Sequence, residues 1–156
     1  MLEEGQKAPD FSLLTDQGET VALAALSGRR VVLYFYPKDD TSGCTAEGKD
    51  FTRLAGAFAA AGATVVGISP DGVASHQRFK QKHQLDVVLA ADEDKAVAAA
   101  YGVWVEKSMY GRKYMGVERA TFLVDGEGRL ARIWRKVKVP GHAEEVLAAV
   151  RALGGV

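Results

Sequence analysis

The chain has 156 residues, and its 20 Lys and Arg balance 20 Asp and Glu, so the formal net charge is zero. This length suits one domain spanning residues 1–156. A hydrophobic share of 47% with 26% charged residues is typical of folded rather than disordered chains. The balanced charge provides no electrostatic footprint for nucleic acid or an anionic membrane. A single cysteine, Cys44, excludes an internal disulfide, a CxxC redox pair and an all-cysteine zinc site.

The chain also lacks the marks of membrane insertion or export. No stretch approaches the roughly 20 apolar residues of a membrane span, and the acidic N-terminus does not have the basic-then-apolar order of a signal peptide. We therefore expect a cytoplasmic location, where a reducing environment lets a free thiol persist.

Strands and helices alternate along the first two thirds of the chain. Residues 31–36 form a β-branched and aromatic run that ends at Pro37, which is typical of a strand buried on both faces. The next segment, 43–61, has helical spacing of its apolar residues. The other elements predicted here are short strands at 10–14 and 20–23, a buried strand at 64–68, a helix at 72–84, a strand at 87–90, and a helix capped by Asp92 or Asp94 that runs to Tyr101.

The last third is different, because strands at 120–124 and 129–134 flank a turn at 125–128 and predict a β-hairpin. An amphipathic helix over 142–153 follows, and we interpret residues 111–113 as a basic loop. The whole order predicts an α/β fold with a central mixed β-sheet and helices on both faces. A parallel β-helix-β half followed by a hairpin and a terminal helix is the thioredoxin-like arrangement.

Cys44 lies where the buried strand gives way to the helix over 43–61. Thr41 or Ser42 can serve as N-cap, which places Cys44 in the first helical turn. Unpaired backbone N–H groups and the positive end of the helix dipole favour a thiolate there. The alternative is an inert buried cysteine that acts as a small hydrophobic residue. The polar residues flanking Cys44 favour the reactive interpretation.

The segment around Cys44 also resembles a known family. Pro37-x-x-x-Thr41-x-x-Cys44 matches the PxxxTxxC signature of peroxiredoxins, and residues 34–47 resemble the bacterioferritin-comigratory, or peroxiredoxin Q, branch. The resemblance continues over residues 5–11, 67–71, 109–116 and 118–125, and so covers nearly the whole chain.

The resemblance implies a thiol-dependent peroxidase acting on hydrogen peroxide and organic hydroperoxides. Cys44 would be the peroxidatic nucleophile, whose thiolate attacks the peroxide to give a sulfenic acid. Thr41 would hydrogen-bond the thiolate and the incoming oxygen, and Arg119 would stabilise the thiolate and polarise the O–O bond. Pro37 would shield the sulfur from water, and Glu47 would orient the arginine.

The chain departs from many members of the branch in one respect. A resolving cysteine often stands five residues after the peroxidatic one, where this chain has Lys49. An external thiol must therefore recycle Cys44, whether a thioredoxin-like or glutaredoxin-like protein, a small thiol or a second subunit's Cys44. The resemblance favours a monomer, with a dimer as the alternative.

Other motifs point to no further chemistry. No organic cofactor or metal is implied, and the three histidines, His76, His83 and His142, are expected at solvent-exposed helix positions. Two other functions stay open: a non-catalytic thioredoxin-fold redox sensor or binding module, and, more weakly, a Cys-His acyl-transfer enzyme, for which no histidine stands near Cys44 in the sequence.

Overall fold

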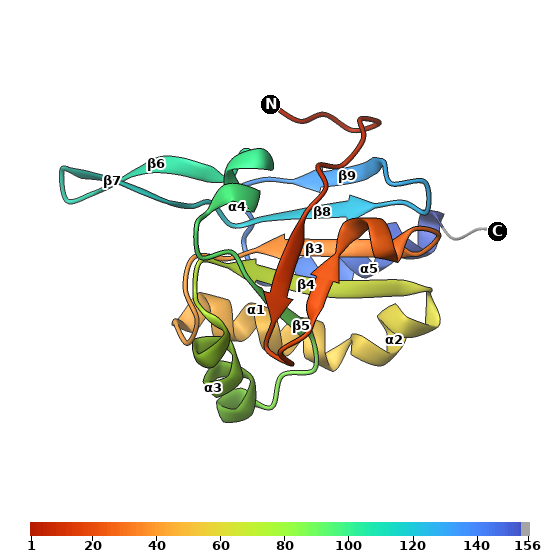
Figure 1. The fold of residues 1–156 in the computed structure, drawn as a ribbon, viewed down its shortest axis with the longest axis horizontal. Coiled ribbons are helices and arrows are strands. Elements are labelled where there is room, and N and C mark those ends of the chain that lie inside the picture. Colours follow the sequence, from red (N-terminus) through yellow and green to blue (C-terminus); the bar gives the residue numbers. More distant parts are fainter. Residues whose placement is uncertain (154–156) are drawn as a thin grey trace.

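A seven-stranded mixed sheet forms the centre of the computed structural model, which describes residues 1–153 (Figure 1). The strands lie in the order β2-β1-β5-β4-β3-β8-β9, and β3, β4 and β5 are parallel to one another. β1 and β8 run antiparallel to their neighbours β5 and β3. The strands of this sheet are β1 (Ser12–Thr15), β2 (Thr20–Ala22), β3 (Arg30–Phe35), β4 (Ala63–Ser69), β5 (Val88–Ala91), β8 (Ala120–Val124) and β9 (Leu130–Trp134).

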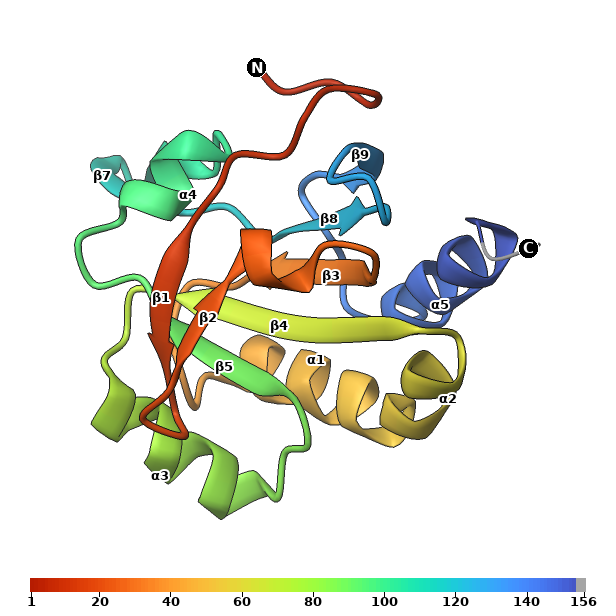
Figure 2. The same ribbon diagram turned by 45° about the vertical axis from the view of Figure 1, so that its right-hand side comes forward.

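Helices cover both faces of the sheet (Figure 2). They are the 3-10 helix η1 (Leu23–Leu26) and the α-helices α1 (Ser42–Arg53), α2 (Ala55–Ala60), α3 (Val73–His83), α4 (Ala96–Ala100) and α5 (His142–Leu153). Residues from η1 and α4 pack into the core on one face, and residues from α1, α2, α3 and α5 pack into the core on the other. This arrangement confirms the predicted α/β class.

The interior strand β3, which lies between β4 and β8, is buried on both sides, as its sequence predicts. Val31, Leu33 and Phe35 point into the core under η1 and α4, while Val32 and Tyr34 point into the core under α1 and α5. Alternation of side chains along a strand produces this division. Fixing β3 in the interior of the sheet fixes the position of the loop that follows it.

The single helix predicted over 43–61 is wrong. The helix breaks at Leu54, whose backbone (φ −98°, ψ 6°) ends α1 before α2 begins at Ala55. Phe51 of α1 and Phe58 of α2, which are seven residues apart, lie side by side with ring centroids 5.7 Å apart. Both side chains enter the same core, so the apolar spacing of the sequence carries no sign of the break.

The basic loop predicted at residues 111–113 is also wrong. Residues 104–117 form an antiparallel hairpin of β6 (Trp104–Met109) and β7 (Arg112–Val117), which extends beyond the rest of the molecule in Figure 1. Tyr110 and Gly111 both have positive φ, 52° and 78°, as a two-residue type I′ hairpin turn requires. Gly111 was the signal in the sequence for this turn.

The expectation of solvent-exposed histidines is wrong, because His83 is half-buried, with 17% of its side chain exposed, and the other two are buried. His76 is fully buried and His142 is 7% exposed. Nε2 of His142 lies 2.7 Å from the hydroxyl of Thr121, and burial lowers the pKa of His142 below its usual value. A histidine hydrogen-bonded inside the core is tolerated because its polar atoms have partners.

The register of β8 against β3 determines which residues lie near Cys44. Phe35, the last residue of β3, pairs with Ala120, the first residue of β8. Because the two strands are antiparallel, Arg119 stands at the same end of the sheet as the loop that leads from β3 to α1. Residues far apart in sequence are thus brought to Cys44.

Candidate active site

Cys44 lies in the first turn of α1 and is 2% exposed. Thr41 occupies the N-cap position with an extended backbone (φ −90°, ψ 157°), and its carbonyl accepts the N–H of Thr45 at 2.9 Å. The sulfur is thus placed beside backbone N–H groups at the positive end of a 12-residue helix. That environment stabilises negative charge on sulfur.

The guanidinium of Arg119 connects two groups of α1. Its Nη2 donates to Cys44 Sγ at 3.4 Å, and its Nη1 donates to Glu47 Oε1 at 2.7 Å. Gly43 makes this approach feasible, since a Cβ at that position would lie 3.0 Å from Nη2. The planar fork of arginine suits this task because it presents several donors in a fixed geometry.

Glu47 is a buried carboxyl, with only 1% of the residue exposed. Burial raises its pKa to about 7, although Arg119 pulls the pKa in the opposite direction. Its second oxygen, Oε2, is buried and has no hydrogen-bond partner among residues 1–153. Near neutral pH, Glu47 thus changes between a neutral acceptor and a full ionic partner of Arg119.

The hydroxyl of Thr41 does not donate to the sulfur. Its proton goes to the carbonyl of Lys38 at 2.9 Å, which leaves the hydroxyl oxygen free to accept. Pro37, partly exposed, follows the buried Tyr36 at the start of the same loop. Thr41 and Pro37 therefore lie on the loop that leads into the Cys44 helix, as the sequence predicts, but the hydroxyl of Thr41 is oriented as an acceptor.

A second cation, Lys107 of β6, was missed in the sequence. Burial lowers the pKa of Lys107, the charge of Arg119 lowers it further, and the proximity of Cys44 raises it. The stem of Lys107 packs over Gly116, where a Cβ would lie 3.2 Å from its Cδ. The β6–β7 hairpin, of which only residues 111–113 were interpreted in the sequence, as a basic loop, thus brings an additional positive charge towards the sulfur.

Histidines take no part in this arrangement. Within residues 1–153, no histidine hydrogen-bonds Cys44: His76 contacts Asp39, His83 contacts Asp40 and His142 contacts Thr121. A Cys-His acyl-transfer site needs its base within hydrogen-bond reach of the sulfur. The partner of the sulfur is instead a permanent cation, which is suited to stabilising anionic sulfur and negative charge on a leaving group.

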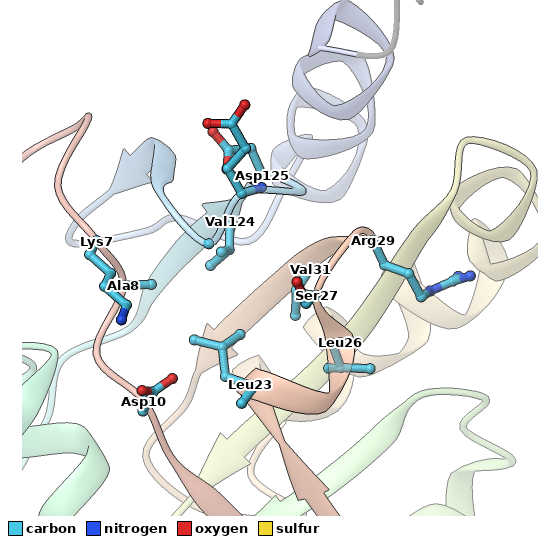
Figure 3. A pocket seen from close by; sticks show the side chains of 13 residues that line it. Lys7, Ala8, Asp10, Leu23, Leu26, Ser27, Arg29, Val31, Val124 and Asp125 are labelled. Carbon is cyan, nitrogen blue, oxygen red and sulfur yellow. Dashed lines mark hydrogen bonds between the residues drawn. The ribbon is translucent and has the colours of Figure 1, made fainter.

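The cavity in Figure 3 lies away from this cluster. It has a volume of about 230 Å³ and is lined by Val31 at the start of β3, together with Leu23 and Val124. Cys44 follows the opposite end of β3, so this cavity is not part of the cysteine site. Over residues 1–153, no three His, Cys, Asp or Glu side chains are grouped to bind a metal ion. In the same range, no helix has the length and apolarity to cross a bilayer.

Comparison with known proteins agrees with the geometry. The model of the AhpC/TSA family matches residues 4–133. A putative peroxiredoxin bcp of Coxiella burnetii is 51% identical over 94% of this chain and 97% of its own. The peroxiredoxin Bcp of Bacillus subtilis is 49% identical over 96% of both chains.

Solved structures extend the likeness to the fold. A structure of the Xanthomonas campestris bacterioferritin comigratory protein, from work on its alkyl peroxide reduction activity, superposes with a TM-score of 0.91 at 43% identity. The match covers 97% of this chain and 99% of that one. The predicted thioredoxin-like fold and the predicted family are both confirmed. The chain belongs to the AhpC/TSA family and is a peroxiredoxin of the Bcp, or peroxiredoxin Q, branch.

Proposed function

We propose that this peroxiredoxin reduces hydrogen peroxide and organic hydroperoxides at Cys44 and is recycled by an external thiol. The observation that carries the proposal is the guanidinium of Arg119, 3.4 Å from Cys44 Sγ and 2.7 Å from the buried Glu47. A permanent cation fixed beside a cysteine at a helix N-terminus favours the thiolate, which is the nucleophilic form of cysteine.

In the first step, the Cys44 thiolate attacks the terminal oxygen of the hydroperoxide. An S–O bond forms as the O–O bond breaks, so sulfur is oxidised to a sulfenic acid and the peroxide is reduced to an alkoxide. The alkoxide, or hydroxide when the substrate is hydrogen peroxide, takes up a proton and leaves as alcohol or water. Arg119 stabilises the charge that develops on the leaving oxygen.

The neighbouring residues have supporting roles in the proposal. Glu47 anchors the guanidinium so that its second N–H group is aimed at the sulfur. Thr41, whose proton is held by Lys38, accepts the hydrogen of the incoming hydroperoxide. Pro37 begins the loop and limits access of water to the sulfur.

Recycling needs two equivalents of thiol from outside the chain. The first thiol condenses with the sulfenic acid, releasing water and leaving a mixed disulfide on Cys44. The second thiol attacks this disulfide and restores the cysteine. A thioredoxin-like or glutaredoxin-like protein or a small thiol fits this chemistry, and we propose that the protein acts as a monomer in the reducing cytoplasm.

Peroxide turnover with excess thiol tests the proposal. The wild-type protein should consume peroxide through many cycles, whereas Cys44→Ser should consume none above the rate without protein. A redox sensor would instead react once and stop with every thiol supplied. Peroxide consumption by Cys44→Ser at the wild-type rate would contradict the peroxidase assignment altogether.

A further inference from the structure

We propose that His76 is a positioning residue: as a buried imidazolium it holds Asp39 and, through the loop over residues 37–41, orients the hydroxyl of Thr41 towards the hydroperoxide. This inference rests on the proposed function and adds α3, which carries His76, to the catalytic apparatus. His76 is fully buried, and Asp39 is 7% exposed. Burial of two ionisable side chains requires a structural explanation.

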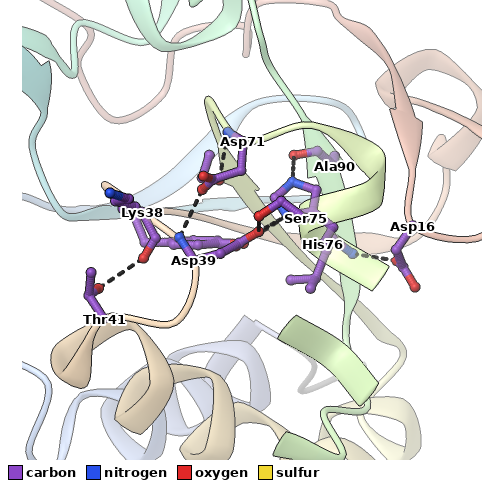
Figure 4. A network of polar contacts seen from close by, with 11 residues as sticks. Asp16, Lys38, Asp39, Thr41, Asp71, Ser75, His76 and Ala90 are labelled. Atoms are coloured by element: carbon purple, nitrogen blue, oxygen red, sulfur yellow. Dashed lines mark hydrogen bonds and ion pairs between the residues drawn. The ribbon is translucent and has the colours of Figure 1, made fainter. Parts of the chain in front are cut away.

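Three side chains lie within hydrogen-bond distance of the Asp39 carboxyl, and two of them, Tyr36 and Ser75, donate hydroxyl protons to it (Figure 4). Tyr36 donates its hydroxyl to Oδ1 at 2.7 Å, and Ser75 donates its hydroxyl to Oδ2 at 2.8 Å. His76 Nδ1 lies 2.7 Å from the same Oδ2. Two hydroxyl donors to one buried carboxyl favour its ionised form, which can also accept a hydrogen bond from His76.

The other ring nitrogen of His76 indicates the charge of the imidazole. Nε2 lies 3.0 Å from the carbonyl of Ala90, which can only accept a hydrogen bond. Nε2 therefore carries a proton, and in the proposal Nδ1 carries a second proton, which it donates to the ionised Asp39. The pair is thus an imidazolium and a carboxylate, closed off from solvent between α3, β5 and the loop.

The loop is fixed through a single peptide group. The N–H of Asp39 donates to Oδ2 of Asp71 at 2.8 Å, and the hydroxyl of Ser69 donates to that same oxygen at 2.6 Å. The carbonyl of this peptide group, which belongs to Lys38, accepts the hydroxyl of Thr41 at 2.9 Å. Asp71 therefore holds one side of the peptide plane and Thr41 binds the other.

This connection links His76 to the chemistry. While Asp39 is clamped, the Lys38 carbonyl keeps its direction and takes the only hydroxyl proton of Thr41. The free lone pairs of Thr41 can then accept the hydrogen on the terminal oxygen of the hydroperoxide, which is the oxygen attacked by sulfur. Releasing the clamp would let the peptide rotate and would misplace the substrate, whereas the thiolate of Cys44 would be retained.

Two reactions of the same sulfur separate positioning from nucleophilicity. Iodoacetamide needs only the thiolate, whereas a hydroperoxide also needs its oriented acceptor. We expect His76→Gln and Asp39→Asn to lower the rate constant with hydrogen peroxide about ten-fold and to leave the rate of alkylation unchanged. Equal loss in both reactions, or no loss in either, would overturn the inference.

Asp40→Asn is the matched control in the same loop. Asp40 has a positive φ of 61°, which asparagine also adopts, and its carboxylate pairs with Lys82 and His83 at the exposed surface, outside the buried network. This variant should keep the wild-type ratio of the two rates. A wild-type protein that is alkylated but inert to peroxide would overturn the proposed function, a result distinct from an unchanged ratio in the His76 and Asp39 variants.

Nitrogen-15 NMR of the histidine rings tests the charge without perturbing the fold. In wild-type protein at pH 7, both ring nitrogens of His76 should carry protons. His83→Gln and His142→Gln, each retaining the His76 signals, supply the assignment. A neutral His76 ring with one bare nitrogen would overturn the inference.

Discussion

The guanidinium of Arg119 contacts both the nucleophile and a buried acid, so its replacement should affect the reaction directly. Arg119→Ala should lower the rate constant with hydrogen peroxide about 100-fold, because a preorganised donor is lost where charge develops. The rate of alkylation of Cys44 by iodoacetamide should also fall, because the cation beside the sulfur is lost. Stopped-flow kinetics and iodoacetamide labelling across pH measure the two effects.

Arg119→Lys is the control for charge alone. Lysine keeps the positive charge but loses the fork that joins Sγ to Glu47. Its peroxide rate should therefore lie between those of wild type and Arg119→Ala. If Arg119→Ala reacts as fast as the wild type, the arginine has no part in the reaction.

Glu47 should make stability depend on pH. Its pKa is about 7 in the folded protein against an ordinary 4.5, so the folded state binds more protons than the unfolded state between these values. The free energy of unfolding contributed by this group therefore falls as pH rises from 4.5 through 7, by at most about 3 kcal/mol.

Urea unfolding at pH 5 and pH 8 measures this dependence. Glu47→Gln keeps an oxygen for Arg119 but has no proton to lose, so the variant should gain stability relative to wild type as the pH rises. Parallel changes in the two proteins would show that the carboxyl is not the source of the dependence.

Among individual residues, those read from the PxxxTxxC segment and its family context lie where they were expected. Cys44, Glu47 and Arg119 are joined by hydrogen bonds, although their catalytic roles stay predictions. His76 was predicted to be exposed but is buried. The sequence could not show this, because a lone histidine in a polar helical segment carries no sign of a buried acid 37 residues away. Such a pairing depends on tertiary structure.

At the scale of elements, the first turn of α1 needs a residue without a side chain at Gly43, so that the guanidinium of Arg119 can approach it. Gly43→Ala would place a Cβ 3.0 Å from Nη2 of Arg119 and push the guanidinium away. We expect a peroxide rate lower by about ten-fold, since small misplacements in a reactive site have large effects. Stopped-flow kinetics beside urea unfolding separates this effect from a loss of stability.

Gly56→Ala is the matched control in α2. Gly56 is exposed and a Cβ there would meet nothing within 4 Å. This substitution should raise the free energy of unfolding by about 0.5–1 kcal/mol through helix propensity and leave the peroxide rate unchanged. A lower peroxide rate in both variants, or in neither, would contradict the steric explanation.

Elements with a strong pattern were predictable, and those defined by packing were not. β3 was found because a buried β-branched and aromatic run ends at Pro37. The break at Leu54 and the β6–β7 hairpin were missed, the first because the apolar helical spacing continues across it to Phe58. The hairpin strands are largely exposed and mix polar residues with exposed apolar ones such as Met109 and Met115, so no alternation of buried and exposed side chains marked them.

At the scale of the whole molecule, the order and direction of the strands bring residues from distant segments together around Cys44. Antiparallel pairing of β8 with β3 brings Arg119 to the helix that carries Cys44. His76 of α3 contacts Asp39 in the loop that joins β3 to α1. The mixed sheet was predictable from the order of elements, whereas the strand register came only with the structure. The assignment of residues 1–156 to one domain stays a prediction.

The single cysteine determines what oxidation can produce. Peroxide-treated protein should show a sulfenic acid on Cys44 and no internal disulfide, because Lys49 stands at the resolving position. Added thiol should then appear as a mixed disulfide that a second equivalent removes. Intact-protein mass spectrometry follows each adduct, and an oxidised protein that forms no adduct with any thiol would contradict recycling from outside.

The central claim is that Cys44 itself reduces the peroxide. Stopped-flow mixing of the reduced protein with hydrogen peroxide in the absence of thiol measures this step directly. The wild-type protein should rapidly consume one equivalent of peroxide and gain one oxygen atom at Cys44. The Cys44→Ser variant should consume none. Consumption of peroxide by Cys44→Ser at the wild-type rate would contradict it.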